Sequence, residues 1–106
     1  MARATGTIQN LTVKITPNDK GNPLGKLTDA ELHFGERVLA GLKLIGFSIW
    51  ERRGGGRNVT FPARQYSVNG ARRSYALLRA ANGEPGAQDS IRQHILDAYT
   101  RVEAAS

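Results

Sequence analysis

The fold is decided by residues 30–50, AELHFGERVLAGLKLIGFSIW. The first five alternate between apolar and polar side chains, which is typical of a half-buried strand. Gly35-Glu36 then predicts a tight turn into another strand over residues 37–50. The apolar residues of that strand fall on both parities, with Leu42 and Leu44 on one and Ile45, Phe47 and Ile49 on the other. Since a regular strand cannot bury both sets on one face, we expect a bulge, a bend or a break between Gly41 and Gly46.

The segments on either side of this stretch extend the predicted sheet. Apolar and polar residues alternate on the N-terminal side, which predicts a strand over about residues 7–16. Residues 17–23 are rich in Pro, Asn, Asp and Gly and predict a turn or a mobile loop. On the C-terminal side, the glycines at 54–56 predict a hairpin turn, and the short strand that follows ends at Pro62.

The last third of the chain is expected to change from strand to helix. Residues 63–70 are expected to form a loop in which Asn69-Gly70 makes a turn. Residues 75–78 predict a last short strand, and residues 80–88 a connector. Apolar residues then recur at helical spacing over about residues 89–103, which predicts an amphipathic helix.

Strands first and one helix last indicate the α+β class. We therefore expect residues 1–106 to form a single domain with a small antiparallel β-sheet of about five strands, within residues 7–79, and one C-terminal α-helix. The chain contains no cysteine, which excludes a disulfide scaffold, a thiolate zinc site and a cysteine nucleophile. No segment is typical of a signal peptide or a membrane span, so the expected location is cytoplasmic.

Positive charge is concentrated in one part of the sequence. Seven of the 15 basic residues, and none of the 9 acidic residues, lie between Arg52 and Arg79. The whole net charge of +6 therefore comes from this segment. Such a field attracts polyanions and speeds their capture. The sequence predicts a protein that binds nucleic acid, DNA or RNA, provided that these arginines converge on one exposed face or lip of the sheet.

The candidate contacts are arginines, because a guanidinium matches phosphate oxygens and stacks on bases. Arg64, Arg72 and Arg73 are the first candidates. Those expected at the hairpin tip come next: Arg52, Arg53 and Arg57. Tyr66 lies among the arginines, as does Tyr75, and aromatic rings between basic residues suit stacking on unpaired bases. For Tyr75, packing in the core is an equally good interpretation.

Three short motifs are similar to those of a known family: LHFGERVLAGLKLI at 32–45, the glycine turn at 54–56 and NVTFPAR at 58–64. With AYTR at 98–101, they make the chain resemble the SpoVG-like septation regulator family over roughly residues 7–102. The resemblance implies a small antiparallel sheet packed with a C-terminal helix, homodimerisation through sheet edges, and site-selective DNA or RNA binding that regulates gene expression. The basic pair that follows the proline in the family is here Arg64 and Gln65, so one of its two charges is missing.

Other interpretations of the basic segment stay open. It can be a solvated surface, or it can pair with acidic residues of a second copy, such as Glu31, Glu36 or Asp97. From another functional class, the chain can be a non-enzymatic interaction module that binds an acidic protein partner. Anionic membrane is disfavoured, because no basic amphipathic helix is present. The glycines at 54–56 can form an anion-binding nest, although a plain hairpin turn explains them better.

No pattern in the chain predicts catalysis. The acidic residues are scattered, and none lies in the basic segment, where a nuclease needs metal-binding carboxylates. His33 and His94 have no neighbours at metal-ligand spacing, and Trp50 is expected to lie mainly in the core. We expect no enzyme activity, no cofactor, no metal and no small-molecule substrate.

Overall fold

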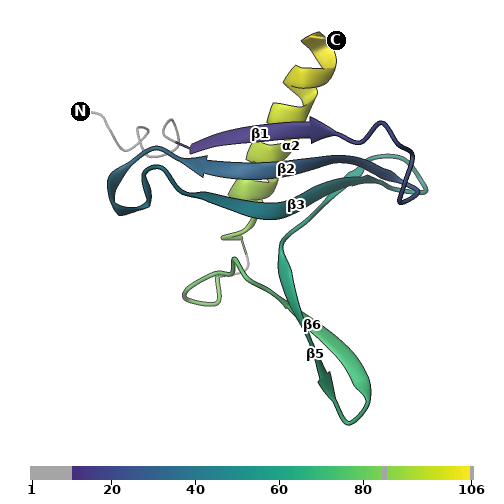
Figure 1. The fold of residues 1–106 in the computed structure, drawn as a ribbon, viewed down its shortest axis with the longest axis vertical. Coiled ribbons are helices and arrows are strands. Elements are labelled where there is room, and N and C mark those ends of the chain that lie inside the picture. Colours follow the sequence, from purple (N-terminus) through teal and green to yellow (C-terminus); the bar gives the residue numbers. More distant parts are fainter. Residues whose placement is uncertain (1–10, 85, 106) are drawn as a thin grey trace.

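The computed structural model describes residues 11–84 and 86–105, and it has an α+β fold. Four antiparallel strands form the main sheet in the order β1-β2-β3-β4. Their bounds are Leu11–Pro17, Lys26–Phe34, Lys43–Glu51 and Arg57–Thr60. Helix α2, Asp89–Ala105, crosses one face of this sheet (Figure 1). The predicted class, the antiparallel sheet and the C-terminal helix are confirmed, while positions 7–10 of the first expected strand lie outside the described residues.

The core lies between the sheet and α2. Alternate residues of β2 point towards the helix, and Thr28, Ala30 and Leu32 are buried. The remaining buried apolar side chains come from β3, β4 and α2: Phe47, Ile49, Val59, Ile95 and Tyr99. The apolar stripe of the helix therefore packs on the apolar face of the sheet, as its spacing predicted.

A β-bulge in β3 explains why its apolar residues occupy both odd and even positions in the sequence. Ala30 pairs with Phe47 and Leu32 with Leu44, so Ile45 and Gly46 together oppose Glu31. The extra residue brings Leu44, Phe47 and Ile49 onto the same face and leaves Ile45 57% exposed. The predicted bulge between residues 41 and 46 is thus confirmed.

The bulge also lies close to the point where the chain leaves the main sheet after β4. Gly46 has φ 105°. A Cβ atom built on it would lie 2.8 Å from the Cβ atom of Pro62, which is buried after β4. Only glycine satisfies both the backbone angle and this close approach.

The connection between β2 and β3 differs from its prediction. In place of a tight turn at Gly35-Glu36, the chain forms a 3-10 turn, Arg37–Leu39, and β3 begins only at Lys43. The Gly41 amide donates to the carbonyl oxygen of Phe34 over 3.0 Å and closes this loop. Apolar residues at 38–42 suggested a strand, but no layer covers them here, and Val38 is 91% exposed.

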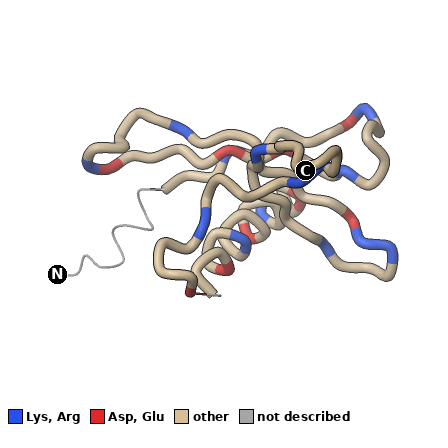
Figure 2. Tube along the Cα trace, turned by 90° about the horizontal axis from the view of Figure 1, so that it is seen from below, with Lys and Arg blue, Asp and Glu red and all other residues tan. Residues whose placement is uncertain are grey.

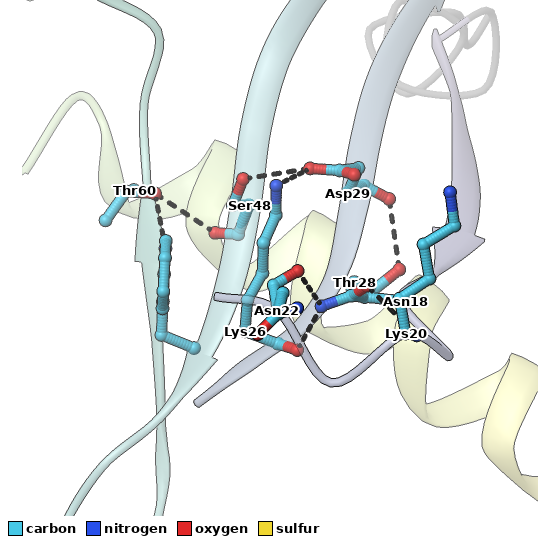
Figure 3. Close-up of polar contacts among 9 residues, drawn as sticks. Asn18, Lys20, Asn22, Lys26, Thr28, Asp29, Ser48 and Thr60 are labelled. Atoms are coloured by element: carbon cyan, nitrogen blue, oxygen red, sulfur yellow. Dashed lines mark hydrogen bonds and ion pairs between the residues drawn. The ribbon is translucent and has the colours of Figure 1, made fainter. Parts of the chain in front are cut away.

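The loop between β1 and β2, by contrast, lies where its Pro, Asn and Gly residues predicted. The side-chain amide of Asn18 donates to the carbonyl oxygens of Asn22 and Lys26, each over 3.0 Å (Figure 3). One side chain therefore ties both ends of the loop together.

Residues 63–76 contradict the sequence prediction most clearly. The expected loop at 63–70 is strand β5, Ala63–Val68, paired with β6, Ala71–Ala76, which begins four residues before the predicted position 75. The described part of the chain therefore has six strands in two sheets rather than about five in one. The predicted turn is confirmed, because Asn69 and Gly70 have φ 51° and 80°, as a two-residue hairpin requires, and residues 75–76 of the predicted last strand do belong to β6. The apolar alternation is missing because neither face of this hairpin packs on a core.

Candidate nucleic-acid interface

The β5–β6 hairpin, which we call the arm (residues 63–76), projects away from the main sheet and α2 (Figure 1). All residues of β5 and the first five residues of β6 are exposed. At its base, the Leu77 amide donates to the carbonyl oxygen of Pro62 over 2.8 Å. The arm is therefore a two-stranded ribbon that presents both of its faces to solvent.

The strand register distributes the arm's side chains over two different faces. Arg64 lies opposite Tyr75, and Tyr66 lies opposite Arg73. Directly opposed residues of an antiparallel pair point to the same side. These four side chains, with Val68 and Ala71 nearer the turn, form what we call the aromatic face. The rings of Tyr66 and Tyr75 meet with centroids 5.7 Å apart.

The opposite side, which we call the polar face, carries smaller side chains. Its cross-strand pairs are Ala63 with Ala76, Gln65 with Ser74, and Ser67 with Arg72. Three predicted contacts, Arg64, Arg73 and Tyr66, are thus brought together, while Arg72 points the other way. Because successive side chains of a strand alternate, the neighbours Arg72 and Arg73 cannot share a face.

Two residues of this surface were not among the predicted contacts. Tyr75 was equally well explained by core packing, but its side chain is 40% exposed on the aromatic face. The Arg79 guanidinium lies 5.7 Å from the centroid of the Tyr75 ring. In the sequence Arg79 only marks the end of the acid-free segment, and no local pattern predicts its contact with Tyr75.

The hairpin-tip arginines lie elsewhere. Arg52 and Arg53 are exposed in the turn between β3 and β4, at one end of the main sheet. Lys and Arg positions are spread over several ends of the molecule (Figure 2). The expectation that all seven arginines share one face or lip of the sheet is therefore wrong. The acid-free segment passes through two separate elements, the β3–β4 turn and the arm.

Arg57 occupies a structural position. Its Nη2 atom donates to Oε2 of Glu103 over 2.7 Å, and its guanidinium lies 4.7 Å from the centroid of the Tyr99 ring. The hydrogen bond to Glu103 is the main cause that raises the pKa of Arg57. This ion pair joins β4 to α2, so Arg57 is a poor candidate for contact with a phosphate.

The other arginines of the segment have no such neutralising partner. Within residues 11–84 and 86–105, no carboxylate oxygen lies within 4.0 Å of a guanidinium nitrogen of the following residues: Arg52, Arg53, Arg64, Arg72, Arg73 and Arg79. Each of these six is exposed. A surface that only keeps a protein soluble normally mixes charges of both signs, which the arm does not.

The face of the main sheet that α2 leaves uncovered is polar and mixed in charge. There the Ser48 hydroxyl donates to Oδ1 of Asp29 over 3.2 Å, and the Lys26 ammonium lies 2.6 Å from the same oxygen (Figure 3). The Trp50 indole donates to the Thr60 hydroxyl over 2.9 Å, so Trp50 belongs to this face rather than to the core. Because its carboxylates compensate its cations, this face is a weaker polyanion site than the arm.

The two histidines have ordinary partners. His33 lies 2.9 Å from Glu31, and this hydrogen bond is the main cause that lowers the pKa of Glu31. His94 lies 3.2 Å from the carbonyl oxygen of Leu11. In the described part of the chain, no three His, Cys, Asp or Glu side chains are grouped as metal ligands. Nor does that part contain a helix long and apolar enough to cross a membrane.

Comparison with known proteins adds no relative: no protein-family model, curated protein or solved structure matches the chain. The resemblance to the SpoVG-like family therefore stays an expectation.

Proposed function

We propose that the protein is a cytoplasmic, non-enzymatic regulator that binds DNA or RNA, as its resemblance to SpoVG-like regulators implies, and that the arginines of its arm make the contacts. Because the seven arginines do not converge on one face, the proposal is centred on the arm, and one observation carries it. The arm is an exposed ribbon with three arginines and no acidic residue. Phosphates contacted by these side chains fix the position of the nucleic acid and carry little sequence information. Arg52 and Arg53 offer a second contact region at the β3–β4 turn.

Homodimerisation through a sheet edge belongs to the same proposal. Among the described strands, β1 pairs only with β2, so its other edge is open. Open edges favour pairing with another chain. A dimer carries two arms, and binding by the first raises the effective concentration of the second.

A salt titration tests the arm's role. We expect the triple variant Arg64→Ala, Arg72→Ala, Arg73→Ala to bind labelled 20-nucleotide DNA and RNA more weakly at low salt. The plot of log affinity against log salt should also become shallower, by about 2 for a single strand and about 3 for a duplex, if each arginine neutralises one phosphate. Fluorescence anisotropy over a potassium chloride series measures both effects.

The matched control removes equal charge away from the arm. Lys14, Lys20 and Arg101 are exposed and lie outside residues 63–76, so their triple alanine variant has the same net charge as the arm variant. If both triple variants lose the same affinity for nucleic acid, the loss is due to net charge alone, which would contradict the arm's role. If the wild type binds no nucleic acid at low salt, the alternative function, a module for an acidic protein partner, replaces this one.

A further inference from the structure

We propose that the aromatic face of the arm binds single-stranded nucleic acid by stacking unpaired bases on Tyr66 and Tyr75. The inference rests on the proposed function and names its substrate class. The two ring side chains belong to different strands, yet they meet on one face at 5.7 Å with an interplanar angle of 51°. Their exposed fractions are 42% and 40%. Each ring is therefore fixed by the hairpin but keeps a large part of its surface open to solvent.

Every ring of this face has an arginine beside it. Arg64 lies directly across from Tyr75, and Arg73 directly across from Tyr66. The Arg79 guanidinium contacts the Tyr75 ring from the base of the arm. Within the described residues, none of the three arginines is paired with a carboxylate. Rings and cations therefore alternate along this face, as bases and phosphates alternate along a nucleic-acid strand.

This arrangement favours an unpaired strand over a duplex. In a duplex the faces of the bases are covered by neighbouring base pairs, so a protein ring reaches only edges, sugars and phosphates. In a single strand the faces are open, and rings beside a basic surface bind them without demanding a particular base. Two exposed tyrosine rings on one face can stack on the bases of a single strand, whereas against a duplex only their hydroxyls can contact the phosphates.

The polar face supplies the competing mode. A two-stranded ribbon fits the major groove of a duplex, where glutamine, arginine and serine hydrogen-bond to base edges. Gln65, Arg72 and Ser74 have that chemistry. Only one of the arm's three arginines lies on that side, however, and the aromatic face has both of the others. The observations therefore favour the aromatic face and make duplex binding the alternative outcome of the test.

The test compares two tyrosine variants on two probes. The probes are a labelled 20-nucleotide mixed-sequence DNA strand and the same strand in a duplex, at 50 mM salt. The double variant Tyr66→Leu, Tyr75→Leu removes both rings and keeps apolar side chains. Tyr66→Phe with Tyr75→Phe keeps the rings and removes only the hydroxyls. We expect the leucine variant to lose about 10-fold or more of its single-strand affinity for each ring that stacks, with duplex affinity unchanged and the phenylalanine variant near wild type.

Two further measurements guard against a misfolded arm. Gln65→Ala with Ser74→Ala alters the polar face and should leave single-strand binding unchanged. In the wild type, an oligonucleotide carrying 5-iodouracil should photocross-link to Tyr66 or Tyr75, with the site mapped by mass spectrometry. Cross-links confined to other residues overturn the inference whatever the variants do.

The outcomes separate the two proposals. Two results overturn the single-strand inference. In the first, the wild type binds strand and duplex equally, and the leucine variant keeps its affinity for both. In the second, the wild type binds the duplex, and this binding depends on Gln65 and Ser74. In both cases the proposed function stands, provided that the arginine triple variant weakens binding. If the wild type binds neither probe, and no RNA either, at 50 mM salt, the proposed function fails and the inference fails with it.

Discussion

Replacement of Gly46 by alanine is expected to lower the free energy of unfolding by about 3 kcal/mol, a large part of the stability of a domain of this size. Two costs add. The residue has φ 105°, where a side chain strains the backbone by about 1–2 kcal/mol. The new methyl group would also lie 2.8 Å from the Cβ atom of Pro62, and overpacking at such a site costs about 1–3 kcal/mol. Urea unfolding followed by circular dichroism measures the sum.

Gly41→Ala is the matched control for this substitution. Gly41 also has a positive φ, 86°, but no atom lies within 4 Å of the position of its missing Cβ. It should therefore show only the backbone cost, about 1–2 kcal/mol. If both variants lose the same stability, the close approach of Gly46 to Pro62 does not matter, and our account of the bulge is wrong.

Excision of the arm is expected to weaken nucleic-acid binding strongly while the rest of the chain stays folded. Residues 63–76 can be replaced by Asn-Gly alone, because Pro62 and Leu77 already face each other across a 2.8 Å backbone hydrogen bond. Residues 62 and 77 lie six ladder positions from the natural turn, an even number, so they form the same type of pair as Val68 and Ala71. The Asn69-Gly70 turn can therefore be moved to the base of the arm without changing the strand register.

Both halves of this expectation are measurable. Since the excised side chains are almost all exposed, the thermal midpoint should move by no more than a few degrees, about what 1 kcal/mol produces in a domain of this size. Affinity for single-stranded DNA at 50 mM salt should fall by about 100-fold or more, since the two arginines and the two stacking rings of the aromatic face are removed. Retained binding would move the site to Arg52 and Arg53, and loss of cooperative unfolding would show that the arm belongs to the core.

The parts of the fold that bury apolar side chains were predictable from the sequence. Apolar residues alternate with polar ones in β2 and recur at helical spacing in α2, and each pattern marks a buried face. The apolar residues of 42–49 occupy both odd and even positions, which correctly predicted a bulge. The arm was missed because its strands bury neither face, so the pairing that holds them is invisible to periodicity. The error at residues 38–42 was the opposite one: their apolar side chains predicted a half-buried strand, but these side chains are exposed in a loop.

The candidate site was predictable only in its composition. An acid-free segment indicated which arginines to examine, but not that Arg72 and Arg73 would be neighbours in strand β6 and so point to opposite faces. The pairing of Arg57 with Glu103, 46 residues away along the chain, depends on how α2 packs against β4, which no local pattern contains. Had residues 63–76 been predicted as strands, their alternation would have placed Arg64 and Tyr66 on a common face.

The two edges of the main sheet have unequal capacities for growth. Strand β4 has only four residues, and the chain leaves it through Pro62, which has no amide hydrogen to donate to a neighbour. Strand β1 has seven residues. When one edge accepts a partner and the other does not, addition of identical copies stops at two instead of continuing into a fibre.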